Sequence, residues 1–238
     1  MDLRNIAIIA HVDHGKTTLV DEMLKQAGSF RDNQVVAERA MDSMDQERER
    51  GITIKLHAVR MDYLAQDGES YELNLIDTPG HVDFTVEVER SLRVLDGAVL
   101  VLCGVGGVQS QSLTVDRQIK RYGVPRLIFI NKLDRTGADP IRVCEEVRTR
   151  LGVEAVLMQL PIGLGIDYEG VVDLVTMQAV YFDGDNGEEL RREEIPESMR
   201  ADAESARDQL LERLAMFDDE LMELCLGEDP VSEALIHK

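Results

Sequence analysis

A run of small, polar and basic residues near the N-terminus has the composition and spacing of a phosphate-binding loop. It reads Ala10-His-Val-Asp-His-Gly-Lys-Thr-Thr and lies between an apolar segment of strand length and a helix-length segment. In such a loop the backbone N–H groups face the phosphates, Lys16 reaches the β and γ phosphates, and the Thr17 hydroxyl ligates Mg²⁺. The general pattern has Gly at the first position, and Ala10 adds only a methyl group. The alternative is a helix that happens to begin with Gly-Lys-Thr. We expect a nucleotide to be bound by Ala10, His11, Val12, Asp13, His14, Gly15, Lys16, Thr17 and Thr18.

A second run, Asp77-Thr-Pro-Gly-His, follows the apolar residues 73–76. An aspartate at a strand end can hold the second shell of a Mg²⁺ ion, and the Gly80 N–H can bond the γ-phosphate. A simple turn would also explain these residue types. Because the run follows a phosphate loop, we expect it to sense the γ-phosphate through Asp77, Thr78, Pro79, Gly80 and His81.

A third run, Asn131-Lys-Leu-Asp, again follows an apolar strand-length segment. The Asp134 carboxylate can accept from the N1–H and the exocyclic amine of guanine, whereas adenine offers neither donor in that arrangement. Asn131 would meet the other base edge, and the Lys132 stem would lie along the ring. We therefore expect guanine selection by Asn131, Lys132, Leu133 and Asp134.

A fourth run, Arg50-Gly-Ile-Thr-Ile, ends a charged stretch at residues 29–51 that is too long for an ordinary connection. Thr53 could close on Mg²⁺ and the γ-phosphate and release them after hydrolysis. The start of a β-branched strand would explain the run equally well. The candidate metal ligands are thus the hydroxyls of Thr17 and Thr53.

The elements that must position these runs alternate between strand-length and helix-length segments as far as residue 152, which predicts an α/β fold with a mostly parallel sheet and helices on both faces. We expect strands at residues 4–10, 55–63, 70–77, 98–103 and 126–130. We expect helices at residues 16–26, 82–95, 109–121 and 139–151, the last with Asp139 as its N-cap and Pro140 in its first turn.

The character of the chain changes after residue 152. Residues 157–163 and 171–182 suggest strands, followed by a turn at residues 183–187. A stripe at spacings of three and four then marks the buried face of one helix, or of two helices broken near Asp218, and comprises Ala203, Ala206, Leu210, Leu214, Phe217, Leu221 and Leu224. We expect a nucleotide domain at residues 1–160 and an inserted, acidic α+β subdomain at residues 161–238.

Composition limits the possible partners. The 238 residues carry a formal net charge of −20, which excludes broad phosphate neutralisation on RNA or DNA. Residues 183–229 alone hold 17 acidic side chains against 5 arginines, either as a solvated face or as a docking surface for a basic partner. The three cysteines lack zinc or redox spacing, and no apolar run is long enough to span a membrane. We expect a cytoplasmic protein.

The four runs, in this order, resemble the translational GTPases. Within them the chain is most similar to the elongation factor G family, through Gly-Val-Gly-Gly-Val-Gln-Ser-Gln-Ser at residues 104–112, Asp-Arg-Thr-Gly-Ala-Asp at residues 134–139 and Gln-Leu-Pro-Ile-Gly at residues 159–163. Asp13-His14 in the phosphate loop is closer to the BipA and LepA relatives. The resemblance implies the fold of a P-loop GTPase carrying an inserted subdomain.

The same resemblance implies roles for particular residues. His81 would orient the attacking water once a ribosomal RNA loop draws it into place, behind a hydrophobic gate of Val12 and Ile52. The acidic insert would contact the ribosomal stalk protein L7/L12. We expect a monomer that binds no DNA and no membrane. The family's fifth nucleotide motif would lie beyond Lys238, so we expect a C-terminally truncated chain with weak isolated affinity for GTP.

These observations favour a GTP-binding and GTP-hydrolysing domain, acting with Mg²⁺ in a ribosomal translocation factor of protein synthesis. Two alternatives stay open: a ribosome-associated GTPase of the BipA or LepA type, and a nucleotide-gated module that binds the ribosome without hydrolysis.

Overall fold

A computed structural model describes residues 2–27, 57–65, 68–77, 92–184, 187, 189–227 and 230–237. The chain divides into two compact units, Met1–Lys132 and Leu133–Lys238. The two units therefore meet at residues 132–133, earlier in the chain than the domain boundary that we expect between residues 160 and 161. That boundary is placed from a change in the sequence pattern, and it stays a prediction. Each unit is described by itself.

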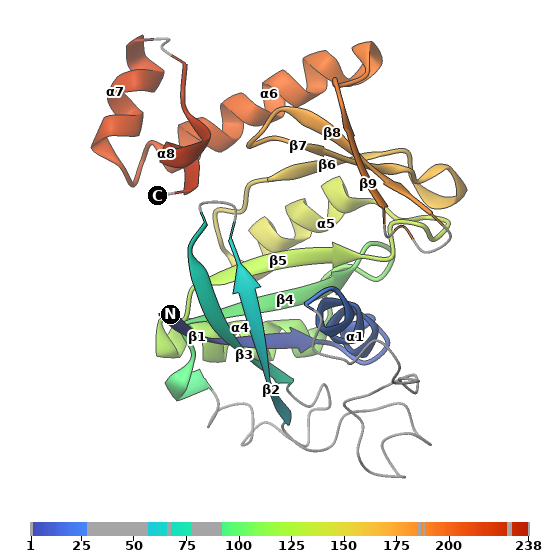
Figure 1. Cartoon of the computed structure of the whole chain (residues 1–238), viewed down its shortest axis with the longest axis vertical. Coiled ribbons are helices and arrows are strands. Elements are labelled where there is room, and N and C mark those ends of the chain that lie inside the picture. The colour runs from blue at the N-terminus through green and yellow to red at the C-terminus, as the bar shows by residue number, and fades with distance from the viewer. Residues whose placement is uncertain are drawn as a thin grey trace. The chain divides into compact units, whose positions relative to one another are not determined.

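The first unit is built on a five-stranded sheet in the order β2-β3-β1-β4-β5 (Figure 1). The strands are β1 (Asp2–Ala10), β2 (His57–Leu64), β3 (Ser70–Asp77), β4 (Gly97–Cys103) and β5 (Arg126–Asn131). β1 pairs in parallel with β3 and β4, β4 pairs in parallel with β5, and only β2 is antiparallel to its neighbour. The mostly parallel sheet expected from the alternating segments is confirmed.

β5 differs from the fully buried strand that its apolar run suggests. Among the described strands it pairs with β4 alone, so it forms an edge of the sheet. Its alternate residues Leu127 and Phe129 are 62% and 42% exposed. An apolar run without a clear period cannot by itself distinguish a central strand from an edge strand.

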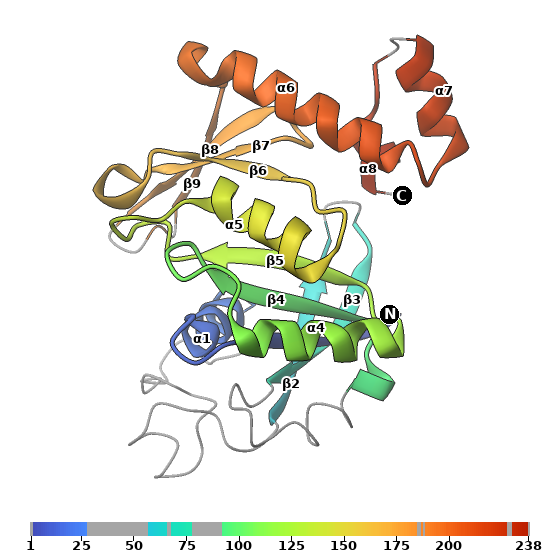
Figure 2. The same ribbon diagram turned by 180° about the vertical axis from the view of Figure 1, so that it is seen from behind.

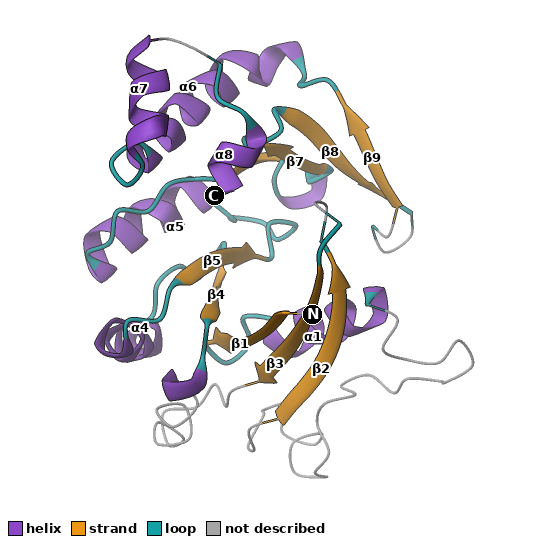
Figure 3. Ribbon diagram, turned by 60° about the vertical axis from the view of Figure 1, so that its left-hand side comes forward, coloured by secondary structure: helices purple, strands orange, loops and turns teal. Residues whose placement is uncertain are grey.

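Two described helices flank this sheet. α1 (Lys16–Gln26) has the predicted bounds, and α4 (Ser110–Tyr122) is shifted by one residue from the predicted range. The crossovers from β1 to β3 and from β4 to β5 run in opposite directions across the sheet. Because parallel crossovers are right-handed, α1 and α4 lie on opposite faces, as Figures 2 and 3 show. The helix expected at residues 82–95 falls mostly outside the described residues, and its end is the 3₁₀ turn η2 (Leu92–Val94).

One apolar core cluster of the first unit packs α1 against the sheet. Its members are apolar residues from α1 and from β1, β2, β3 and β4, and they are Ile8, Ala10, Val20, Leu24, Met61, Leu75 and Val101. β1 ends with four buried residues in succession, as expected for a strand covered on both faces. The residues that follow β1 are therefore anchored by its most buried part.

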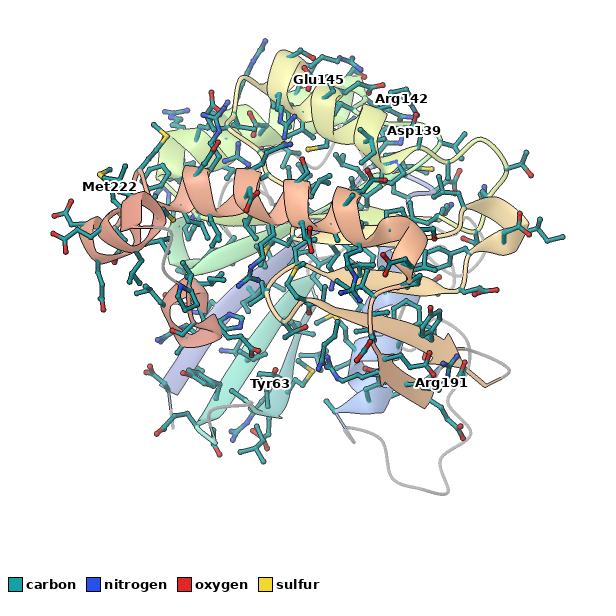
Figure 4. The ribbon with its side chains drawn as sticks, turned by 90° about the horizontal axis from the view of Figure 1, so that it is seen from above. Tyr63, Asp139, Arg142, Glu145, Arg191 and Met222 are labelled. Carbon is teal, nitrogen blue, oxygen red and sulfur yellow. The ribbon has the colours of Figure 1, made fainter. Side chains whose placement is uncertain are left out.

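The second unit begins with α5 (Pro140–Glu146), which continues as a π-helical turn, η3 (Val147–Leu151). The predicted N-cap is confirmed, because an Asp139 carboxylate oxygen accepts from the Arg142 N–H at 2.9 Å (Figure 4). A second, antiparallel sheet follows in the order β6-β7-β8-β9. Its strands are β6 (Gln159–Ile162), β7 (Gly170–Asp173), β8 (Gln178–Asp183) and β9 (Glu189–Glu193), with the 3₁₀ turn η4 (Gly165–Asp167) between β6 and β7.

The single strand that residues 171–182 suggest is in fact the hairpin β7–β8. The side chain of Asp173 ends β7 by accepting from the N–H groups of Val175 and Thr176 at 2.8 and 3.2 Å. Met177 then adopts a left-handed φ of 53° that returns the chain. Val171 pairs with Val180 across the two strands. The turn was missed because three of its four residues are apolar and no Gly or Pro marks it.

The helical stripe forms two helices, α6 (Glu197–Leu214) and α7 (Asp219–Gly227), so the alternative with a break near Asp218 is confirmed. Asp218 accepts from the Leu221 N–H at 3.0 Å and begins α7. Ala203 and Leu210 pack with residues of β6, β7 and β8 in the core of this unit. Phe217 was wrongly assigned to the buried face: it lies in the turn between the helices and is 85% exposed. A short helix, α8 (Glu233–His237), follows.

β9 was missed because every one of its side chains is exposed, so it has no apolar alternation. Arg191 projects from β9 (Figure 4) and pairs with Asp183 at 2.6 Å and with Glu193. Its guanidinium also lies 4.5 Å from the centre of the Tyr181 ring. Within the described ranges, no helix combines the length and the apolar character that crossing a bilayer requires.

Candidate functional site

The carboxyl ends of the parallel strands bring the sequence runs to one edge of the first sheet. Ala10 at the end of β1 pairs with Val101 of β4, and Cys103 at the end of β4 pairs with Asn131 of β5. β3 ends at Asp77, beside Ile8 of β1. Open α/β sheets bind their ligands outside this edge. The runs after β1, β3 and β5 therefore begin where a ligand is expected.

The run after β1 forms a tight loop that leads directly into α1. The His14 N–H donates to the His11 carbonyl at 3.2 Å, and Asp13 and Gly15 have left-handed φ angles of 64° and 88°. Gly15 is the N-cap of α1, and the first turn of the helix carries no acidic residue. The N-terminal N–H groups of the helix and its dipole thus remain suited to an anion.

The side chains of this loop differ in exposure. Ala10, His14 and Lys16 are buried, whereas Asp13 and Thr18 are exposed. Four predicted residues are half-buried, namely His11, Val12, Gly15 and Thr17. The loop therefore offers backbone N–H groups, the Lys16 ammonium and the Thr17 hydroxyl from one continuous segment.

Asn131 and Lys132 contact the loop from the end of β5. The Asn131 amide N–H donates to the His14 carbonyl at 3.0 Å, and its carbonyl oxygen accepts from the Lys132 N–H at 2.8 Å. The Lys132 ammonium donates to the Asp13 carbonyl. We expected these two side chains at the base, and the structure gives them a further role: they brace the phosphate loop.

The backbone of both partners is unusual. Asp13 and Lys132 are non-glycine residues with left-handed φ angles, 64° and 63°, and they contact each other. Such conformations are uncommon outside glycine and gather at binding sites, where surrounding contacts hold them. The two hydrogen bonds from Asn131 and Lys132 supply such contacts.

The loop after β4 is a part of the site that sequence reasoning did not assign to it. The Gly104 N–H donates to the Asn131 carbonyl at 2.8 Å, and the Gly107 N–H donates to the Cys103 carbonyl at 2.8 Å. The signal was present in the Gly-rich residues 104–107, which served only as evidence of resemblance. This loop bonds the start of the run after β5, and its Gly106 lies close to the His14 ring of the run after β1.

The third run is divided between the two units. Leu133 and Asp134 belong to the second unit, where the Leu133 carbonyl accepts from the Gly165 N–H at 2.8 Å and Asp134 is exposed. Burial raises the pKa of the Tyr168 phenol, and the nearby Asp134 carboxylate raises it further. The selection of guanine by Asp134 stays a prediction.

The remaining candidates fall outside the described residues. They are Ile52, Thr53, Thr78, Pro79, Gly80 and His81, together with the side chain of Asp77. Within the described ranges no three His, Cys, Asp or Glu side chains gather into a metal site. Mg²⁺ favours oxygen ligands and commonly binds through one or two protein oxygens plus phosphates. The Thr17 hydroxyl fits that donor set.

A parallel sheet with a Gly-Lys-Thr loop between its first strand and first helix, braced by Asn-Lys from a later strand, defines a P-loop nucleotide-binding domain. The family described as "Elongation factor Tu GTP binding domain" matches residues 1–223. The chain belongs to this family of GTP-binding domains of translation factors.

Its relatives include elongation factors G from three bacteria. Identity is 54% to elongation factor G 1 of Syntrophus aciditrophicus over 98% of this chain, and 54% to elongation factor G of Rhodopirellula baltica over 99%. It is 56% to elongation factor G 2 of Anaeromyxobacter dehalogenans over 98%. A crystal structure of a protein from Thermus thermophilus matches 98% of this chain and 34% of its own, with a TM-score of 0.82 at 26% identity. The chain spans 34% of the length of each of these elongation factors.

Proposed function

We propose that the chain hydrolyses GTP as the nucleotide domain of a ribosomal translocation factor of the elongation factor G type. The observation that carries this proposal is the phosphate loop held by Asn131 and Lys132, because it joins the segment expected at the phosphates to the segment expected at the base. The elongation factor G relatives favour this type over the BipA or LepA type.

In the proposed mechanism the chain binds and orients GTP and leaves the phosphoryl transfer to an attacking water. The N–H groups of the loop and of the first turn of α1 bind the phosphates, and Lys16 meets the β and γ oxygens. Bound Mg²⁺ would neutralise charge that develops on the phosphates, with Thr17 and Thr53 as its protein ligands. His81 would orient the water, and Gly80 would report the γ-phosphate.

The proposed partners follow from the resemblance and from the charge of the second unit. The ribosome would contact His81 through an RNA loop and the acidic residues 183–229 through the stalk protein L7/L12. Residues 183–229 have a formal charge of −12, and several of their carboxylates already pair with arginines of this unit, as Asp183 does with Arg191. Exposed carboxylates such as Asp202, Glu204 and Asp208 of α6 would be those that meet a basic partner. We propose a cytoplasmic monomer.

Guanine selection is tested by Asp134→Asn. We expect GDP affinity to fall by about 100-fold or more, because the amide keeps one acceptor oxygen but turns its NH2 donor toward the second guanine donor and leaves that donor unpaired. ADP affinity should not change, and calorimetric titration measures both. The matched control is Asp208→Asn, an exposed aspartate on α6. Equal loss of affinity in both variants, or an unchanged GDP affinity in Asp134→Asn, would contradict the assignment.

Hydrolysis is tested by His81→Ala in multiple-turnover GTPase assays with and without ribosomes. We expect ribosomes to stimulate the unmodified chain and the variant to lose about 100-fold or more of that stimulated rate, as is typical of a positioned proton-transfer or water-orienting group. GDP binding should be retained. A chain that binds GTP yet shows no hydrolysis under either condition is the non-hydrolysing module instead.

A further inference from the structure

The His14 side chain is the most deeply buried polar side chain of the phosphate loop. It is 3% exposed, and its Nδ1 lies 3.2 Å from the Val101 carbonyl oxygen of β4. A carbonyl oxygen only accepts, so Nδ1 must carry the proton of this hydrogen bond. The ring is therefore directed at the backbone of β4.

The opposite ring nitrogen, Nε2, is buried and has no hydrogen-bond partner among the described residues. Its surroundings are tight: a methyl group added at Gly106 would lie 3.8 Å from this nitrogen and 3.1 Å from the amide nitrogen of Gln109. A neutral ring leaves a bare lone pair at Nε2. A protonated ring would bury an unpaired N–H donor and a charge, which is costly.

One residue thus connects three segments. The His14 ring bonds the end of β4, and the His14 carbonyl accepts from Asn131 at the end of β5. We propose that His14 is a positioning residue whose neutral ring, protonated at Nδ1 alone, holds the phosphate loop in its nucleotide-binding conformation. This inference rests on the proposed GTP-binding function and adds a residue that acts on the loop without contacting the nucleotide.

The electrostatic surroundings give the proposal a measurable signature. Burial lowers the pKa of His14, and the nearby His11 and Lys132 lower it further, against the opposing effects of the Val101 carbonyl and Asp13. The His11 ring centre lies 5.1 Å from that of His14. If the loop leaves β4, the His14 ring is no longer buried and regains the ordinary histidine pKa near 6.5. Below about that pH, the ordered loop therefore binds fewer protons than the loop that has left β4. Nucleotide affinity should therefore fall as the pH drops below about 6.5.

The test compares variants of the whole chain by titration with a fluorescent GDP analogue from about pH 8 to about pH 5.5, the range in which histidine titrates. His14→Asn keeps an N–H donor near the position of Nδ1 but cannot titrate. His14→Ala removes the donor. His237→Gln is the control, because His237 is exposed on α8 and lies outside the loop. Thermal unfolding at about pH 8 checks that each variant is folded.

We expect the unmodified chain and His237→Gln to lose about three- to tenfold in affinity between pH 7 and pH 5.5, consistent with one linked proton. At pH 8, His14→Asn should bind GDP more tightly than His14→Ala does, and it should lose much less affinity on acidification than the unmodified chain. His14→Ala should bind about tenfold more weakly at pH 8. Equal pH slopes in the unmodified chain and His14→Asn, or full affinity in His14→Ala, would overturn the proposal. A chain that binds no guanine nucleotide at any pH refutes the proposed function itself.

Discussion

Replacing Gly15 by alanine is expected to lower the affinity for guanine nucleotide by about 100-fold. A methyl group at this position would lie 2.5 Å from the Asn131 amide nitrogen, which bonds the His14 carbonyl. Gly15 also has a φ of 88°, a conformation that costs an L-residue about 1–2 kcal/mol. Displacing Asn131 adds a packing cost of about 1–3 kcal/mol, and about 2.7 kcal/mol corresponds to 100-fold in affinity. Calorimetric titration with GDP measures the loss.

Gly123→Ala is the matched control for Gly15→Ala. Gly123 ends α4 with a φ of 66°, and nothing lies within 4 Å of a methyl group added there. This variant therefore carries the backbone strain without the collision, and we expect a small loss of stability with unchanged GDP affinity. If both variants lost affinity equally, strain alone would explain the effect and the contact between Gly15 and Asn131 would be unimportant.

Replacing Asp116 by alanine is expected to lower the free energy of unfolding by about 3 kcal/mol. Asp116 on α4 is 2% exposed and pairs with Arg126 of β5 at 2.5 Å and with Lys120 at 3.0 Å. The Arg126 side chain is only 14% exposed, so the variant leaves a buried guanidinium without its ionic partner. Breaking a buried pair from one side typically costs about 3–5 kcal/mol, and the partly exposed Lys120 places this site near the lower limit. Urea denaturation gives the value.

Asp116→Ala could lower stability because an ion pair is lost or because the Arg126 charge is left buried without a partner. The double variant Asp116→Ala/Arg126→Leu distinguishes these two causes. When both partners are removed, most of the stability should return, because no charge is left buried. The exposed pair between Asp2 and Arg4, at 2.7 Å, gives a second control, and Asp2→Ala should cost no more than about 1 kcal/mol. An Asp116→Ala variant as stable as the unmodified chain would show that α4 and β5 are held together by apolar contacts alone.

Local patterns predicted β3, α1 and the start of α5, because these features depend on a regular buried face or on neighbouring residues. β3 and α1 have the predicted bounds, and the N-cap at Asp139 is confirmed, since a short-range hydrogen bond depends only on neighbouring residues. The predictions that failed concern features that depend on contacts with residues far away in the sequence. Three of the four residues in the turn between β7 and β8 are apolar, and no apolar residue alternation marks β9.

The candidate site was likewise predicted only in part from the sequence. The types and spacing of Lys16 and Thr17 indicated a phosphate site without any structure, because phosphate loops need those groups in that order, and the run at Asn131 indicated a base site. The bracing of the loop could not be predicted. The contacts of Asn131 with His14 and of Lys132 with Asp13 join residues 117 and 119 positions apart. They exist only because β4 lies between β1 and β5 in the sheet.

The phosphate loop shows most clearly which properties follow from the local sequence and which follow from the tertiary structure. By itself, the sequence determined that a loop between residue 10 and the helix beginning at Lys16 carries, with the first helical residues, the groups that phosphate binding requires, because loop chemistry and helix starts are local properties. Only the tertiary structure decided that the His14 ring faces β4 while its carbonyl faces Asn131. The order of the strands, set by long-range pairing, determines which groups meet a side chain that the sequence shows only as a histidine.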